Sequence, residues 1–464
     1  MKKIYFLIFT FLGLGIGATN AQYTILHTST GIDGQDPWGS LTLSGGKLFG
    51  MMALGGTYFD GVIFSMDTNG NNYKVLLNFN RTNGLSPYGS LTISGEKLYG
   101  MAHEGGAYNY GCIFCIDSNG ANYKDLWDFT NDTGTNGSSP LGSLTLSGHK
   151  FYGMTEFGGG VGNLFSIDTN GRDYRNLHFF YNGTYSGSPM GSLLLSGGQL
   201  FGMTEGDGPN GNIFSIDTNG NGYKDLFLFN GTNGSSPYGS LIMSGGKFYA
   251  MTTYGGANDS GCVFSIDTSG NGYKKLLDFN GANGAWPQGD LTIVGGTLYG
   301  MTYHGGAHHL GVIFSIDTSG SGYNDVHDFS RGFGGFPTGS LTPSGNVLYG
   351  MTFGGFDIFR FNYITVGMNE LPAANGGMKL FPNPNNGVFT IEMKSEKLYE
   401  GIPLGKASNL VEVYNMLGEK IYISTLNTST TQIDLCNNAN GIYLYRVITE
   451  TGNLISSGKF VIEK

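Results

Sequence analysis

A segment of about 50 residues recurs along the chain, and this repeat restricts the fold more than any other feature. The first copy runs from Pro37 to Phe79, and its Gly-Ser(Asp)-Leu opening returns at steps of 50, 53, 49, 48, 50 and 50 residues. The opening glycines are Gly39, Gly89, Gly142, Gly191, Gly239, Gly289 and Gly339. Periods of roughly 40–50 residues built from short strands are typical of propellers and solenoids.

Each copy contains four short apolar runs separated by residues that favour turns. In the first copy these runs are Ser40–Leu43, Lys47–Met51, Val62–Met66 and Tyr73–Phe79. Gly-Gly and Asn-Gly between the runs favour tight hairpins. Several runs are apolar on both faces, which predicts a sheet covered on both sides by neighbouring sheets.

The two ends of the array complement each other. Tyr23–His27 matches the fourth run of the other copies, whereas the seventh copy has no fourth run after Phe361. Pairing these ends removes two exposed sheet edges. We therefore predict the all-β class, with a seven-bladed β-propeller over residues 22–362 closed by the N-terminal strand. An open solenoid is the alternative.

The segments outside the array have other compositions. Residues 1–21 have the features of an export signal: Lys2-Lys3, an apolar run and a small-residue cleavage site. The apolar run is short for a membrane span, and we expect no span elsewhere. Residues 363–377 are predicted to be a linker. Residues 378–464 alternate in polarity and predict a separate small β-domain.

The composition argues against several kinds of partner and site. The net charge is −10, so we expect no nucleic-acid partner. Four cysteines do not make a disulfide framework in a chain of this length. Cys112 and Cys115 form a Cys-x-x-Cys string, but residues i and i+3 of a strand point to opposite faces, so we predict no metal or redox site there.

Function is expected where the repeats differ from one another. In a four-stranded blade, the loops from the second to the third strand and from one blade to the next emerge on one face. These loops carry aromatic, carboxylate and imidazole side chains, which suit a sugar or a peptide. The candidate ligand-binding residues are Trp38, His103, Glu104, Glu156, Glu205, Asp207, Tyr254, Trp286, Tyr303 and His304. The alternative is that they are ordinary loop residues.

Other chemistry has less support. The turn from Asp217 begins like an EF-type calcium loop, but its twelfth position is Leu228, so a plain hairpin turn is favoured over calcium, and no other cofactor is expected. His27, His178 and His327 share a repeat position with Leu77 and are interpreted as packing residues. A glycosidase needs two carboxylates about 5–10 Å apart, and nothing in the sequence selects such a pair. We therefore assign no catalytic residue.

The repeats resemble the GloVer tandem-repeat family of bacterial surface proteins. The resemblance rests on Leu298–Thr302, Gly305-Gly306, Gly311–Phe314 and Tyr323–Phe329, with Met in place of the usual Thr after Tyr-Gly in most copies. It implies a repeat-built propeller on an exported protein and carries no settled activity.

The tail resembles the type A C-terminal sorting domain of the type IX secretion system. The motif residues are Pro382, Asn383, Pro384, Gly387, Gly418, Gly441, Tyr443 and Lys459, and Ser395–Ser408 is an insertion. The resemblance implies an immunoglobulin-like β-sandwich that the secretion machinery recognises, and a secreted or outer-membrane surface location.

These observations favour an exported, monomeric, non-catalytic propeller that recognises an extracellular glycan or protein. A polysaccharide-acting propeller enzyme and a purely structural surface component are the alternatives.

Overall fold

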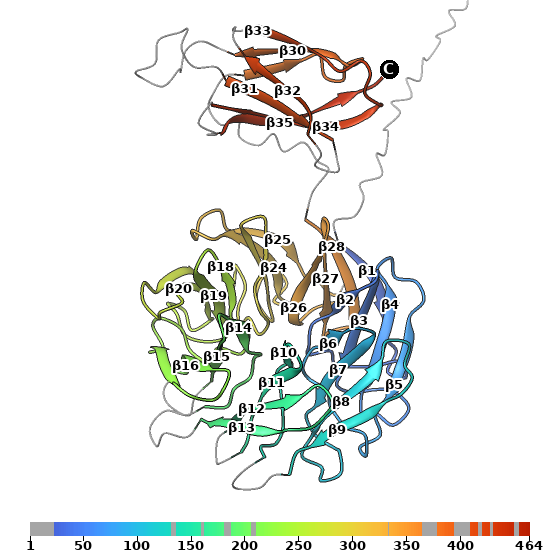
Figure 1. Ribbon diagram of the computed structural model, residues 1–464, viewed down its shortest axis with the longest axis vertical. Coiled ribbons are helices and arrows are strands. Elements are labelled where there is room, and N and C mark those ends of the chain that lie inside the picture. Colours follow the sequence, from blue (N-terminus) through green and yellow to red (C-terminus); the bar gives the residue numbers. More distant parts are fainter. Residues whose placement is uncertain are drawn as a thin grey trace, which may run out of the picture. The chain divides into compact units, whose positions relative to one another are not determined.

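The computed structural model describes residues 23–130, 136–158, 162–180, 187–205, 210–332, 334–363, 378–393, 409–415, 420–426, 430–449 and 454–464. The chain divides into two compact units, residues 1–364 and 365–464 (Figure 1). Within the described residues the secondary structure is entirely β, so no helix there could cross a membrane. The predicted export signal, residues 1–21, and residues 364–377 of the predicted linker lie outside the described residues.

Unit 1 contains seven four-stranded antiparallel sheets. Sheet 1 consists of β2 (Thr42–Ser44), β3 (Lys47–Met52), β4 (Val62–Asp67) and β5 (Lys74–Asn78). Sheet 2 consists of β6 (Thr92–Ser94), β7 (Lys97–Ala102), β8 (Cys112–Asp117) and β9 (Lys124–Asp128). Sheet 3 consists of β10 (Thr145–Ser147), β11 (Lys150–Thr155), β12 (Asn163–Asp168) and β13 (Arg175–Phe179).

The remaining sheets repeat this order. Sheet 4 consists of β14 (Leu194–Ser196), β15 (Gln199–Thr204), β16 (Asn212–Asp217) and β17 (Lys224–Leu228). Sheet 5 consists of β18 (Ile242–Ser244), β19 (Lys247–Thr252), β20 (Cys262–Asp267) and β21 (Lys274–Asp278). Sheet 6 consists of β22 (Thr292–Val294), β23 (Thr297–Thr302), β24 (Val312–Asp317) and β25 (Asn324–Asp328). Sheet 7 consists of β26 (Pro337–Ser344), β27 (Val347–Thr352), β28 (Asp357–Asn362) and β1 (Tyr23–Thr28).

The first strand of the chain therefore completes the last sheet, as predicted. β1 pairs antiparallel with β28, and Tyr23 lies opposite Phe361. Buried residues of sheet 7, Tyr349 and Met351, pack in one cluster with Leu48 and Phe64 of sheet 1. The two ends of the array are thus in contact through a shared apolar core.

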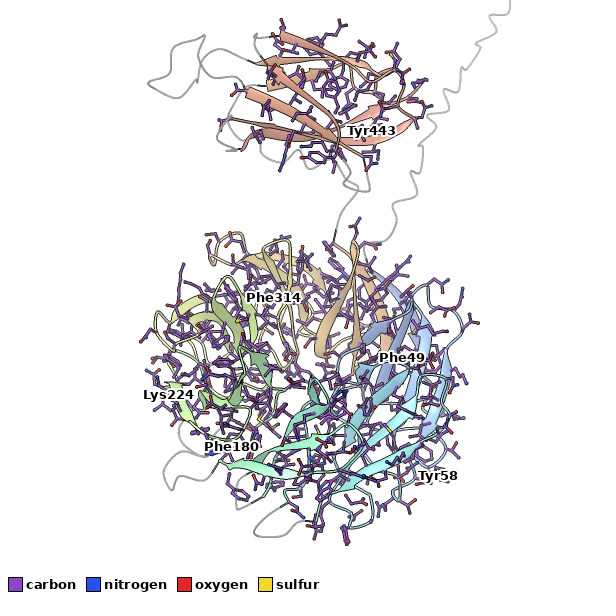
Figure 2. All side chains as sticks on the ribbon, in the orientation of Figure 1. Phe49, Tyr58, Phe180, Lys224, Phe314 and Tyr443 are labelled. Carbon is purple, nitrogen blue, oxygen red and sulfur yellow. The ribbon has the colours of Figure 1, made fainter. Side chains whose placement is uncertain are left out.

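Apolar side chains fill the space between successive sheets. Phe49 of sheet 1 packs with Phe114 of sheet 2, and Phe314 of sheet 6 packs with Tyr249 of sheet 5. Figure 2 shows Phe314 inside the unit and Lys224 at its periphery. Burial on both faces explains why the strands lack polar alternation.

A hydrogen-bond circuit connects the inner ends of all seven sheets. The donor is a backbone N–H just before the first strand in sheets 1 to 6 and within β26 in sheet 7. It donates to a side-chain oxygen at the same position of the next sheet, with donor–acceptor distances of 2.5–2.9 Å. The circuit runs through Ser40, Ser90, Ser143, Ser192, Ser240, Asp290 and Ser340 and returns to Ser40. In Figure 1 the sheets follow one another around a common centre.

The glycines before this circuit are required by close packing. The glycine preceding each circuit residue faces the carbonyl of its counterpart in the next sheet, and a Cβ on Gly142 would lie 2.1 Å from the Gly191 oxygen. Only a residue without a side chain allows the first strands to approach so closely.

Within the described residues, ring stacking joins the outer part of five of the junctions between neighbouring sheets. The histidines interpreted as packing residues do pack: the ring centroids of His27 and Tyr73 are 3.8 Å apart, those of His178 and Tyr223 3.9 Å, and those of His327 and Tyr23 4.1 Å. Burial lowers the pKa of His327 to about 4. The three histidines are therefore structural.

The two sulfur atoms of the Cys-x-x-Cys string lie on opposite faces of β8, as predicted. Cys112 packs with sheet 1 through Phe79, whereas Cys115 packs with sheet 3 through Phe151. Neither forms a disulfide.

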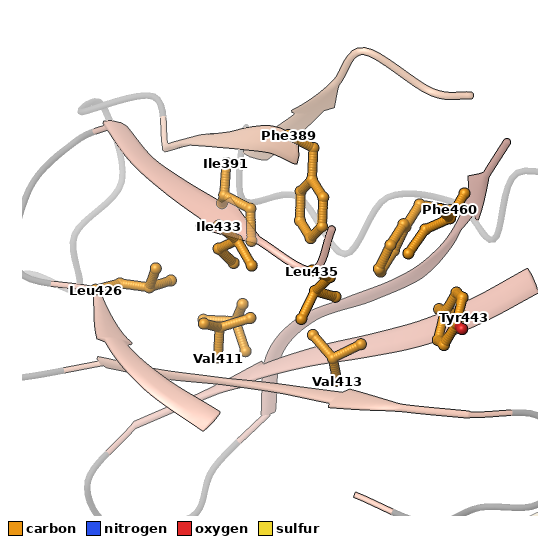
Figure 3. Packing of buried hydrophobic residues seen from close by; sticks show 11 residues of the cluster. Phe389, Ile391, Val411, Val413, Leu426, Ile433, Leu435, Tyr443 and Phe460 are labelled. Atoms are coloured by element: carbon orange, nitrogen blue, oxygen red, sulfur yellow. The ribbon is translucent and has the colours of Figure 1, made fainter. Parts of the chain in front are cut away.

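Unit 2 consists of two antiparallel sheets. One contains β29 (Met378–Phe381), β30 (Val388–Met393) and β33 (Thr430–Asp434). The other contains β32 (Lys420–Leu426), β31 (Asn409–Tyr414), β34 (Gly441–Ile448) and β35 (Leu454–Ile462). Phe389 and Ile433 from the first sheet and Val411 and Phe460 from the second share one buried core (Figure 3).

Candidate functional site

Two sets of loops emerge at the same end of the seven sheets, which we call the loop face. One set joins the second strand to the third in each sheet, and the other joins each sheet to the next. A backbone hydrogen bond ties the two sets together in every sheet. The first residue after the second strand donates its N–H to the carbonyl of the residue that precedes the proline at the start of each repeat. The donors are Ala53, His103, Glu156, Glu205, Thr253, Tyr303 and Phe353.

The backbone before several of these prolines is left-handed. The φ angle is +55° at Asp36, +52° at Ser86, +56° at Trp286 and +53° at Phe336. A bulky residue with positive φ is uncommon and strained. At Trp286 the conformation is fixed by two backbone bonds, in which its N–H donates to Ser260 and its carbonyl accepts from Tyr303.

Aromatic rings form a continuous series over sheets 5, 6 and 7. Tyr238 contacts Tyr254 with a centroid distance of 6.3 Å, and Tyr254 contacts Trp286 at 6.1 Å. Trp286 meets His304 edge-on at 4.9 Å. His304 and Tyr303 both contact Phe336, at 5.0 and 5.3 Å.

The series continues across the junction of the first and last sheets. Phe353 contacts Tyr303 at 6.5 Å and Trp38 at 6.2 Å. Trp38 then meets Tyr88 edge-on at 5.5 Å, and Tyr88 meets His103 at 4.9 Å. We call this series, from Tyr238 through Trp38 to His103, the aromatic arc.

Part of the arc remains open to solvent. Trp38 is 39% exposed, Trp286 38% and Tyr254 37%. Large aromatic rings with this exposure, lying in one series, provide stacking surfaces for the apolar faces of a ligand.

A polar group lies at one end of the arc. The Nε2 atom of His103 is 3.4 Å from Oε2 of Glu156 in the next sheet, and its Nδ1 is 3.8 Å from Oε1 of Glu104. At the other end, the Tyr238 hydroxyl donates to Oε1 of Glu205 at 3.2 Å. Burial raises the pKa of Tyr88, and the nearby carboxylates of Glu104, Asp36 and Glu156 raise it further.

The structure thus brings most of the predicted candidates together. Trp38, His103, Tyr254, Trp286, Tyr303 and His304 lie in the arc, and Glu104, Glu156 and Glu205 contact its ends. Asp207 lies outside the described residues.

The candidate set omitted four members of the arc: Tyr88, Tyr238, Phe336 and Phe353. Alignment of the repeats would have found them. Tyr88 and Tyr238 directly follow the proline that starts their repeat, as Trp38 does. Phe336 directly precedes that proline, as Trp286 does. Phe353 is the first residue after the second strand of its sheet, as Tyr303 is.

Among the described residues, no three His, Cys, Asp or Glu side chains gather as a metal ion would require. In the turn that begins at Asp217, the Asp217 N–H donates to the Asn221 carbonyl. The Asn221 N–H donates to the side-chain oxygen of Asn219, as in a tight hairpin.

The sequence model of the Gloeobacter/Verrucomicrobia repeat matches residues 15–212 and 160–366, which together include all seven sheets. The chain belongs to the Gloeobacter/Verrucomicrobia repeat family. Its arc residues lie in the segments that differ most between copies of this repeat. No curated protein matches the chain.

Residues 379–463 match the secretion system C-terminal sorting domain. In unit 2 three of the predicted motif residues make contacts within that domain, and Asn383 connects its two ends. Oδ1 of Asn383 accepts from the Val461 N–H at 2.8 Å, and the Gly387 carbonyl accepts from the Leu435 N–H. Tyr443 is buried in the core and donates to the Ala439 carbonyl. Gly418 lies outside the described residues.

The remaining motif residues lie around this connection. The bonds before Pro382 and Pro384 are cis, Gly441 begins β34, and Lys459 is exposed on β35. The sorting domain implies an interaction with the type IX secretion machinery. It indicates secretion and a cell-surface or outer-membrane location.

Two solved structures of low sequence identity share the fold. Two structures of the extracellular domain of BT4673 from B. thetaiotaomicron have a TM-score of 0.51, at 13% and 12% identity. The matches cover 95% and 80% of this chain and 58% and 44% of those chains. PorZ, a surface component of the type-IX secretion system of Porphyromonas gingivalis, has a TM-score of 0.48 at 12% identity, over 95% of this chain and 61% of PorZ.

Proposed function

We propose that this protein is an exported, non-catalytic recognition protein whose seven sheets are the blades of one closed β-propeller. The hydrogen-bond circuit from Ser40 to Ser340 and back supports closure. In this proposal unit 2 is an immunoglobulin-like address domain, and the aromatic arc binds an extracellular glycan.

The observation that carries the proposal is the aromatic arc. Rings on a rigid β scaffold offer contact area at low entropic cost, since the loops beneath them are already fixed by backbone hydrogen bonds. Flanking carboxylates and imidazoles supply hydrogen-bond partners for hydroxyl groups. Partly exposed tryptophans beside polar groups suit a sugar ring, which has apolar faces and a polar edge.

The test is binding of the full exported chain to a broad glycan panel. Trp38→Ala and Trp286→Ala are each expected to lower the affinity for a bound glycan about tenfold or more, because each removes an aromatic contact with the ligand. Leu228→Ala serves as the control, because Leu228 is 50% exposed but lies on β17, outside the arc. Absence of binding across the panel, or equal losses in all three variants, would contradict the proposal.

One observation favours a second candidate, a polysaccharide-acting enzyme. Glu104 and Glu156 both lie beside His103, so two carboxylates from neighbouring sheets face one imidazole. General acid–base chemistry on glycosides uses paired carboxyl groups. Release of reducing ends from a bound polysaccharide, abolished by Glu156→Gln, would favour this candidate over pure recognition.

A further inference from the structure

The loops of the loop face are acidic and contain no lysine. Carboxylates occur in the loops of sheets 1 to 5, among them Asp36, Glu104 and Glu156. Within the described part of these loops, Arg81 and Arg331 are the only lysine or arginine side chains.

The lysines of unit 1 gather at the opposite end of the sheets, and four of them pair with carboxylates there. Four second strands begin with lysine, and each lysine pairs with the aspartate that ends the third strand. The Nζ–Oδ1 distances are 2.9 Å for Lys47–Asp67, 2.6 Å for Lys97–Asp117, 2.8 Å for Lys150–Asp168 and 3.8 Å for Lys247–Asp267. The lysines of unit 1 therefore lie away from the loop face, which keeps an excess of negative charge.

The negative charge converges on one member of the aromatic arc. Tyr88 lies between Trp38 and His103, and the carboxylates that act on its hydroxyl come from three successive sheets: Asp36, Glu104 and Glu156. Among the described residues, neither Glu104 nor Glu156 contacts a lysine or an arginine.

The His103 imidazole lies at the same place. Its side chain is only 15% exposed, and its Nδ1 atom is buried without a hydrogen-bond partner among the described residues. A buried polar atom without a partner is uncommon and costs free energy. Aromatic rings, carboxylates and this imidazole together suit a ligand that brings both a ring and a hydrogen-bonding cation.

We propose that the ligand of the aromatic arc is a cationic glycan, whose sugar rings carry primary ammonium groups that bind beside Tyr88. This inference rests on the proposed function and specifies its ligand class. The sugar faces stack on Trp38 and Tyr88, and the ammonium group is attracted by Asp36, Glu104 and Glu156 and by the faces of the rings. Glycans rich in carboxylate or sulfate are repelled by the same charges.

The experiment compares three oligosaccharide probes of equal length on the full exported chain by isothermal titration calorimetry: glucosamine, N-acetylglucosamine and galacturonate oligomers. The glucosamine oligomer is expected to bind at least about tenfold more tightly than the acetylated one at low salt. The difference should shrink at high salt, because salt screens exposed charges. The galacturonate oligomer should bind weakest.

Charge-neutral variants separate this inference from the proposed function. The double variant Glu104→Gln and Glu156→Gln should lose about tenfold more affinity for the glucosamine oligomer than for the acetylated one. Glu96→Gln is the matched control, since Glu96 is exposed in a hairpin at the opposite end of sheet 2. Equal binding of both oligomers, or a preference for the acetylated one, would overturn the cationic ligand and leave glycan recognition standing. If neither these probes nor any glycan of the wider panel binds, both the cationic ligand and glycan recognition at the arc are overturned.

Discussion

Replacing Asp290 with serine is expected to stabilise unit 1 at neutral pH. Asp290 occupies the position that serine holds in the other six sheets of the hydrogen-bond circuit. Its Oδ1 accepts from the Ser240 N–H at 2.5 Å, and its own N–H donates to Ser340 Oγ at 2.7 Å. A serine keeps both bonds and removes a carboxylate from the crowded centre of the seven sheets.

The size of this stabilisation and its dependence on pH follow from the environment of Asp290. Burial raises its pKa, and the hydrogen bonds from Ser240 and Ser340 offset only part of this effect. Because the native pKa exceeds the unfolded one, about 3.9, the ionised group destabilises the native state at high pH and not below the unfolded pKa. Desolvating such a group costs about 1–3 kcal/mol. Asp290→Ser should gain that amount at pH 7, and the gain should shrink as the pH falls toward 4.

The assay is thermal unfolding of the wild type and Asp290→Ser at pH 7 and pH 4.5, with calorimetry resolving the two units. A gain of about 2 kcal/mol corresponds to roughly 3 °C in Tm for a unit of this size. Ser240→Asp is the mirror control, since it adds a second carboxylate to the circuit and should lower the Tm at pH 7. An unchanged or lower Tm for Asp290→Ser at pH 7, or a gain that grows on acidification, would refute this reasoning.

Three further variants test individual contacts by urea unfolding. Tyr123→Phe removes the hydroxyl that donates to the Asn83 carbonyl at 2.7 Å and should cost about 1 kcal/mol; no loss would mean that the bond contributes nothing net. Gly142→Ala places a Cβ 2.1 Å from the Gly191 oxygen and should cost about 3 kcal/mol or more, so a neutral result would contradict the close approach at the centre. Phe59→Asn should gain about 0.5–1 kcal/mol, because Phe59 is 67% exposed with φ +61° and asparagine tolerates that conformation better; destabilisation would indicate that the Phe59 ring has a packing role.

The strand pattern could be predicted from the sequence because turn residues mark every strand boundary. The predicted runs Lys47–Met51 and Val62–Met66 differ by one residue from β3 and β4. The first run was placed less well, since Ser40–Leu43 was expected and β2 begins at Thr42. The reason is that Ser40 uses its N–H to reach Ser90 of the next sheet, so it does not join the ladder of its own sheet.

The candidate site could be predicted in location but not in connectivity. Alignment of the repeats places His103 and Glu156 at equivalent positions of neighbouring sheets, so their contact could be predicted. The order of ring contacts could not, because it depends on ring orientations set by side-chain packing. The same alignment explains why the aromatic arc does not extend over sheets 3 and 4, because Leu141 and Met190 occupy the position of Trp38 there.

The most direct test of ligand recognition at the aromatic arc uses the three tryptophans of the chain. Trp38 and Trp286 lie in the arc, whereas Trp127 is stacked on Tyr174 at 4.3 Å. In a Trp127→Phe background, all tryptophan fluorescence therefore reports on the arc. We predict that a saturating glycan protects this fluorescence from acrylamide quenching. A glycan that binds with the same affinity but leaves quenching unchanged would contradict recognition at the arc.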